Sequence, residues 1–138
     1  NWVQDYCATL HNAALGDVAM AQVGVSFCEG ILLQFPDENS LFIENFRASL
    51  GEFHFLAGDP AQGREILTQL IADLPHRSVG YAHLSDMLGK PQYNRTVNTP
   101  IDRNLAIELL KTALAHPVVD AADYDLEKRL QDFLPPQK

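Results

Sequence analysis

Residues 50–75, LGEFHFLAGDPAQGREILTQLIADLP, carry the pattern from which the architecture follows. Gly58 ends an apolar run, where a glycine commonly terminates a helix, and Asp59 is a good cap for the start of another. Beyond Asp59 the large apolar residues recur at the spacing of one helical stripe: Ile66, Leu67, Leu70, Ile71 and Leu74. Pro75 cannot continue that helix. The stretch therefore predicts two antiparallel helices joined by a tight turn.

The same two kinds of turn recur along the chain. Prolines that follow apolar runs stand at Pro36, Pro75 and Pro117, which are 39 and then 42 residues apart. Alternating glycine and proline turns predict helix pairs repeated about every forty residues. The glycines predicted to divide each pair are Gly16, Gly58 and Gly89. The predicted repeat units cover residues 2–36, 38–75 and 77–117.

These signals predict an all-α chain, because alternation with period two is nowhere sustained. A long loop is expected at about 90–101, between the two helices of the third unit. A last helix over about 120–134, with most charged residues on one side, would cap the array. The other expected helices cover about 2–15, 18–35, 38–57, 60–74, 77–89 and 103–116. The expected fold is an α-solenoid of about three antiparallel helix pairs with a C-terminal capping helix.

Size and composition indicate one globular domain over residues 1–138. Of the 138 residues, 46% are hydrophobic and 20% charged, as in ordinary soluble domains. The formal net charge of -8, without a dense basic patch, argues against a nucleic-acid partner. No apolar run reaches the ~20 residues of a membrane helix and no signal peptide is present, so we expect a cytoplasmic protein without a membrane partner. Because the chain opens at Asn1 already in a helical pattern, we expect a piece of a longer protein.

The second unit resembles a tetratricopeptide (TPR) repeat. The residues that match in order and spacing are Leu50, Gly51, Gly58, Gly63, Leu67 and Pro75. In that pattern a small residue lets the second helix approach the first, and a large one fills the gap between neighbouring pairs. The resemblance implies a right-handed superhelix whose concave face is lined by the first helix of each pair.

The other units depart from that pattern. The third keeps Tyr81-Ala82, Gly89, Ala106 and Ala113, but about a dozen inserted residues separate its helices. The first helix of unit one matches poorly, and Leu70 is larger than the residue usual there. Three strings also look like bacterial helical-repeat proteins that often carry a zinc-binding SEC-C motif: Phe35-Pro36-Asp37-Glu38, Glu44-Asn45-Phe46-Arg47 and Gly80-Tyr81 through Ser85-Asp86. That motif needs a cysteine and histidine cluster, which is missing here, so we expect no metal and no other cofactor.

Few residues suggest chemistry. Cys7 and His11 are four apart on one helical face, as a nucleophile or half a metal site would be, although a packed helix face is the alternative. Cys7 and Cys28 are too few for a disulfide scaffold and fit buried small hydrophobes. His83 and Asp86, three apart, form a plausible hydrogen-bonded pair or ligand contact. Phosphate loop, nucleophile elbow and HExxH string are all missing, so we expect no enzyme.

The expected function is binding at the concave face. By the TPR resemblance, that face should present six side chains: Tyr6, Asn45, Glu52, Phe55, His83 and Asp86. This partly acidic set predicts a protein or peptide partner with basic or amide donors. It argues against a carboxylate clamp, which needs several cations where only Arg47 is near. We therefore expect an adaptor or scaffold. The alternative is a self-association segment that uses the apolar helix expected at about 18–35, which would make a homo-oligomer. An enzyme or a metal protein is the least favoured class.

Overall fold

The structure, a computed structural model, describes residues 2–35, 41–94, 101–116 and 118–136. Over these ranges it contains seven α-helices and one 3₁₀ helix, η1, and no β-strand. The elements are α1 (Trp2–Ala14), α2 (Val18–Gln34), α3 (Leu41–Leu56), α4 (Pro60–Asp73), α5 (Val79–Gly89), η1 (Pro91–Asn94), α6 (Arg103–Ala115) and α7 (Leu126–Phe133). The prediction of an all-α chain is confirmed over this part of the sequence.

The glycine turns within the first two helix pairs form as predicted. Gly16 and Gly58 have φ values of 102° and 91°, the left-handed conformation that glycine adopts without steric cost. The aspartate after each turn caps the next helix: the Asp17 carboxylate accepts from the Met20 amide, and the Asp59 carboxylate from the Gln62 amide. Local sequence signals therefore set both turns.

Gly89 plays a different part from the predicted turn. It is the last residue of α5, and a Cβ atom at this position would lie 2.4 Å from the ring of Phe133 in α7. The glycine is required by a close contact between two helices rather than by backbone conformation. Of the predicted 90–101 loop, Pro91–Asn94 form η1, and residues 95–100 lie outside the described ranges, as do Pro36 and Pro117.

The last helix is shorter than predicted. It was expected from about residue 120 but begins at Leu126, after a turn in which Asp125 is left-handed with φ 50°. The reason is a tertiary contact of Asp120, which is 5% exposed. Its carboxylate accepts a hydrogen bond from the Ser78 amide at 2.8 Å and pairs with Arg77 at 3.2 Å. A side chain used to cap α5 in this way cannot also open α7 as a helix.

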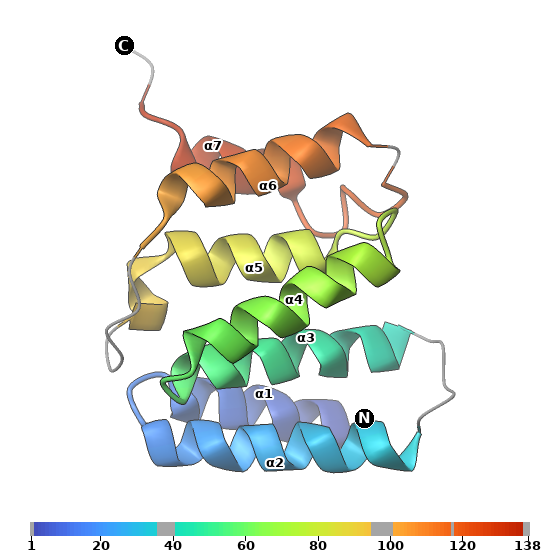
Figure 1. Ribbon diagram of the computed structural model, residues 1–138, viewed down its shortest axis with the longest axis vertical. Helices are drawn as coiled ribbons and strands as arrows, with labels where there is room; N and C mark the ends of the chain where they lie inside the picture. Colours follow the sequence, from blue (N-terminus) through green and yellow to red (C-terminus); the bar gives the residue numbers. More distant parts are fainter. Residues whose placement is uncertain (1, 36–40, 95–100, 117, 137–138) are drawn as a thin grey trace.

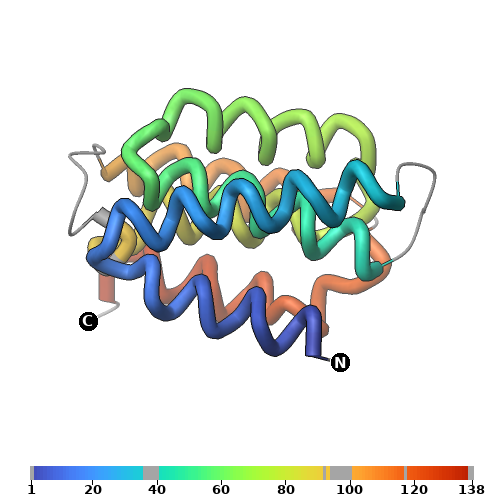
Figure 2. Tube along the Cα trace, turned by 90° about the horizontal axis from the view of Figure 1, so that it is seen from below, coloured from blue at the N-terminus to red at the C-terminus, as the bar shows by residue number. Residues whose placement is uncertain are grey.

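Helices that follow one another in sequence pack against one another, from α1 to α7. The first helices of the pairs also meet, because α3 contacts both α1 and α5. Figure 1 shows the helices stacked from α1 and α2 at one end to α6 and α7 at the other. Figure 2, viewed from the α1 and α2 end, shows α1 and α4 at opposite edges. None of the described helices is long and apolar enough to cross a membrane.

The core lies along the stack in two clusters. One is centred on Phe46 and Phe53 between α1, α2 and α3, and the other runs from Ala48 of α3 to Phe133 of α7 through α4, α5 and α6. Between α3 and α4 the packing follows the predicted logic of small against large. A Cβ atom on Gly51 would lie 2.6 Å from the Leu67 side chain, which is completely buried. On α3, contacts with α1 and α5 bring the three helices round one pocket.

Candidate functional site

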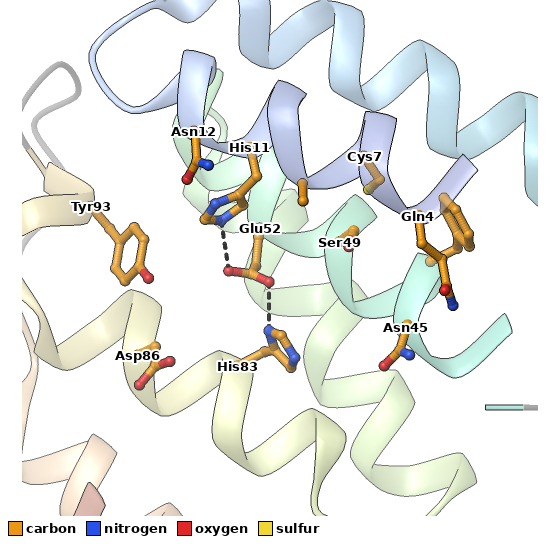
Figure 3. A pocket seen from close by; sticks show the side chains of 12 residues that line it. Gln4, Cys7, His11, Asn12, Asn45, Ser49, Glu52, His83, Asp86 and Tyr93 are labelled. Carbon is orange, nitrogen blue, oxygen red and sulfur yellow. Dashed lines mark hydrogen bonds and ion pairs between the residues drawn. The ribbon is translucent and has the colours of Figure 1, made fainter. Parts of the chain in front are cut away.

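A pocket of about 500 Å³ lies between α1, α3, α5 and η1 (Figure 3). Its volume is in the range typical of small-molecule and side-chain binding sites, roughly 300–1,000 Å³. Most of its lining residues carry a polar group, although apolar atoms make up more of the wall. The lining residues are Gln4, Cys7, Ala8, His11, Asn12, Asn45, Phe46, Ser49, Glu52, His83, Asp86 and Tyr93.

The centre of the pocket is the carboxylate of Glu52 on α3, which is 5% exposed. One of its oxygens lies 3.1 Å from Nε2 of His11 on α1, and the other lies 2.5 Å from Nδ1 of His83 on α5 (Figure 3). A buried carboxylate is costly unless it is paired, and here each oxygen has a partner on a different helix. Glu52 therefore joins the first helices of all three pairs.

The three groups shift one another's proton affinity. Burial by itself lowers the pKa of His83, but the charge and hydrogen bond of Glu52 outweigh it, and the pKa is raised. The pKa of His11 is raised in the same way. Burial by itself raises the pKa of Glu52, but the two histidines lower it well below its usual range. The arrangement therefore favours the ionised carboxylate of Glu52 and the protonated forms of both histidines more than water does.

The predicted pair of His83 and Asp86 does not form. His83 binds Glu52, whereas Asp86 pairs with Arg129 on α7 at 2.5 Å and with Lys90 at 3.1 Å. The two side chains are three residues apart on α5 and contact different neighbouring helices. Asp86 still adds to the raised pKa of His83 through its charge.

Four of the predicted site residues come together in the pocket: Asn45, Glu52, His83 and Asp86. The other two lie elsewhere. Tyr6 is 43% exposed and packs edge-on against Phe27 of α2, with ring centroids 4.9 Å apart. Phe55 is 2% exposed and packs where α3 meets Gly63 of α4, so it is core and offers no surface to a ligand. Phe55 follows Glu52 by three residues, and that rotation turns it from the pocket towards α4.

Sequence reasoning did not assign several lining residues. Cys7 and His11 were noticed as a pair at helical spacing, yet His11 interacts with Glu52, 41 positions away. Ser49 lies on the same face of α3 as Asn45 and Glu52, so helical period could have found it. Gln4 and Asn12 lie on the face of α1 that faces the pocket, which is not the face of the assigned Tyr6. Tyr93 lies on η1, and its place in the pocket follows from a loop conformation that no periodicity indicates.

The pocket is less acidic than the sequence suggested. Both of its carboxylates are already paired within the chain, Glu52 with two histidines and Asp86 with Arg129 and Lys90. Arg47 pairs with Asp73 of α4 and does not line the pocket. Among the described residues, no group of three or more histidine, cysteine, aspartate or glutamate side chains is arranged to hold a metal ion.

No model of a protein family matches this chain, and no curated protein or solved structure is significantly similar to it. The geometry of the pocket is therefore what bears on function.

Proposed function

We propose that the chain is a protein- or peptide-binding module, an adaptor or scaffold rather than an enzyme, which holds an extended segment of its partner in the pocket between α1, α3 and α5. The observation that carries the proposal is the composition of this pocket: amide, imidazole and aromatic side chains from three successive first helices surround one hollow. Such a surface can contact several consecutive residues of an extended chain.

We also propose that the helix pairs form a TPR-like right-handed superhelix capped by α7. Two observations support it. Each pair follows the last in series, with α1, α3 and α5 in mutual succession. The close approach of α3 and α4 at Gly51, Gly63 and Leu67 falls at the positions of the TPR resemblance. In such an array the first helices line the concave face, and the pocket lies between the first helices α1, α3 and α5.

The pocket favours main-chain and amide groups of the partner over a charged side chain. Asn12 and Asn45 are exposed at its rim, and each carries both donor and acceptor groups, like the peptide unit itself. The Asn45 carbonyl oxygen lies 3.5 Å from the hydroxyl of Tyr124, which leaves its NH₂ group directed to other acceptors. Glu52 and Asp86 are already neutralised within the chain, so a lysine or arginine gains little by entering.

A peptide phage-display library tests the proposal. Enriched peptides should bind the purified chain in fluorescence polarisation, and Asn12→Ala and Asn45→Ala should each weaken binding roughly 2- to 10-fold, the worth of one hydrogen bond. Asn104→Ala, an exposed asparagine on α6 away from the pocket, is the matched control and should change nothing. If no peptide is enriched, or if enriched peptides bind all three variants like the native chain, the pocket is not the binding site.

Self-association through α2 is the second candidate. Exposed residues of α2 recur at alternating intervals of four and three, as in the seam of a coiled coil: Ala19, Val23, Ser26, Gly30 and Leu33. Val23 is 44% and Leu33 80% exposed, and the seam carries no charge. A second copy of the same helix is complementary to such a face. Sedimentation velocity over a hundredfold range of concentration tests it: a monomer throughout removes the candidate, whereas a dimer that Leu33→Glu dissociates supports it.

A further inference from the structure

The pocket wall contains a thiol that shares a core cluster with a second thiol on the neighbouring helix. Cys7 of α1 lines the pocket and is 8% exposed, while Cys28 of α2 is completely buried behind it. Both cysteines are free, both belong to the same core cluster, and α1 packs against α2. Each thiol shifts the pKa of the other, chiefly through side-chain hydrogen bonding between the two. One thiol of this pair faces a hollow and the other does not.

The surroundings make the two thiols unequal. Hydrogen bonding by Cys28 is the largest cause that lowers the pKa of Cys7, and it outweighs the opposite effect of burial. Ser49 and His11 lower the pKa of Cys7 further, whereas the charge of Glu52 raises it. The net result is a pKa of about 7 for Cys7. The same hydrogen bond and burial raise the pKa of Cys28. Because the thiolate is the reactive form, Cys7 is the nucleophile of the pair. Beside it, Glu52 raises the pKa of His11 and so favours the protonated imidazole.

We propose that Cys7 and Cys28 form a peroxide-sensitive dithiol that closes to a disulfide between α1 and α2. Cys7 thiolate attacks one oxygen of hydrogen peroxide, an S–O bond forms, the O–O bond breaks, and the leaving hydroxide takes a proton to become water. The Cys28 sulfur then attacks the sulfenic sulfur of Cys7. An S–S bond forms, the S–O bond breaks, and the proton of Cys28 leaves with the hydroxide as a second water. Two thiols lose two electrons, which reduce one peroxide to two waters.

The geometry sets the order of these steps. Peroxide, being small, reaches Cys7 through the pocket, but Cys28 has no exposed surface. For the second step the two side chains are close by, because both belong to the one core cluster between the packed helices α1 and α2. The new bond joins α1 to α2 at the edge of the pocket, where it changes the wall that Cys7 shares with Ser49 and His11.

Thiol trapping with mass spectrometry tests the proposal on the native chain. The chain is treated with one equivalent of hydrogen peroxide, unfolded and alkylated. Neither cysteine should then be alkylated, and the mass should be about 2 Da below that of the reduced, unalkylated chain. The peptide map should contain a Cys7–Cys28 crosslink. Dithiothreitol should restore both alkylation sites. A chain that is alkylated at both cysteines after peroxide, or that is joined only between copies, overturns the proposal.

Single-cysteine variants test the order. Cys28→Ser should stop at the sulfenic acid of Cys7, which dimedone labels, whereas Cys7→Ser should leave Cys28 unlabelled. The folded native chain avoids any folding defect of these variants: iodoacetamide should modify Cys7 at least roughly tenfold faster than Cys28. The rate of Cys7 modification should rise with pH about a midpoint near 7. This midpoint should lie higher in the variant His11→Gln, because the positive charge of the imidazolium beside Cys7 is lost. Equal rates at the two thiols, or a midpoint near that of an ordinary thiol, about 8.5, contradict the assignment.

Discussion

At the scale of single residues, Glu52 shows what local sequence can and cannot indicate. The TPR resemblance assigned it to the binding face together with Asn45, His83 and Asp86, and the structure brings these four residues to one pocket. Its partners were not predictable, because His11 and His83 lie 41 and 31 positions away and no sequence period links them. The same limit explains why the sequence predicted a hydrogen bond of Asp86 with His83. The actual partner, Arg129, comes near Asp86 only because α7 packs against α5.

The raised histidine pKa values predict how stability depends on pH. A group whose pKa is higher in the folded chain stabilises the fold fully below its unfolded pKa, about 6.5 for histidine, and this is lost as the pH rises through the folded value. The lowered pKa of Glu52 acts in the opposite sense: its contribution is present above about pH 4.3 and lost as the pH falls through the folded value. The free energy of unfolding should therefore fall as the pH rises above about 6.5.

The variant Glu52→Gln isolates this effect, since it keeps the shape of the side chain and removes its charge. At pH 6 we expect it to lower the free energy of unfolding by about 1–3 kcal/mol, the usual worth of hydrogen bonds to a charged group, and by less at pH 9. Urea denaturation at several pH values measures both curves. A constant difference between the two curves across this range would show that the histidines are not linked to Glu52.

At the scale of elements, the contact of α3 with α4 depends on having no side chain at Gly63. A Cβ atom there would lie 2.5 Å from the ring of Phe55 and 2.6 Å from the carbonyl oxygen of Gly51, and a backbone atom cannot step aside. Gly63→Ala should therefore destabilise the chain by about 1–3 kcal/mol, although alanine is the better helix former. Gly30→Ala is the matched control, because no atom lies within 4 Å of a Cβ at Gly30 in α2. The variant Gly30→Ala should stabilise the chain by about 0.5–1 kcal/mol. Thermal melting temperatures that shift in the same direction for both variants would contradict this account of the packing.

A second prediction at this scale concerns the remote cap of α5. The buried Asp120 carboxylate accepts from the Ser78 amide and pairs with Arg77, which also binds Glu44. Asp120→Ala removes the acceptor of the buried Ser78 amide and the partner of the Arg77 guanidinium. It should therefore lower the free energy of unfolding by about 1–3 kcal/mol. Asp123→Ala, an exposed aspartate in the same turn, should stay within about 0.5 kcal/mol of the native chain in chemical denaturation. Equal losses would mean that the turn, and not the cap, stabilises α5.

These elements also show how far the fold was predictable. Helices bounded by local signals, such as the turn at Gly58 and the cap at Asp59, begin and end close to the predicted residues. The start of α7 was misjudged because Asp120 is drawn to α5, 42 positions earlier in the chain. The part played by Gly89 was misjudged because Phe133 fills the space beside it. In both cases a tertiary contact decides what the local pattern leaves open.

At the scale of the whole molecule, the helices contact their neighbours in series, and two polar contacts tie the ends of the series to α5. Glu52 links α1 to α3 and α5 through His11 and His83, and Asp86 links α5 to α7 through Arg129. In a chain built in this way, stability is approximately the sum of local terms and contacts between neighbours. Weakening one end should therefore leave the other end protected.

Native-state hydrogen exchange on two reciprocal variants tests this expectation. His11→Ala removes the link of α1 to Glu52, so amides of α1 should exchange roughly 5- to 100-fold faster, the equivalent of about 1–3 kcal/mol, while those of α6 keep their protection. Arg129→Ala removes the link of α7 to Asp86 and should accelerate α7 while sparing α1 and α2. If each variant instead accelerates every helix by the same factor, the chain opens only as a whole. The two ends would then be coupled through the core that spans α3 and not through separable neighbour contacts, and the series architecture would no longer account for the stability of the pocket.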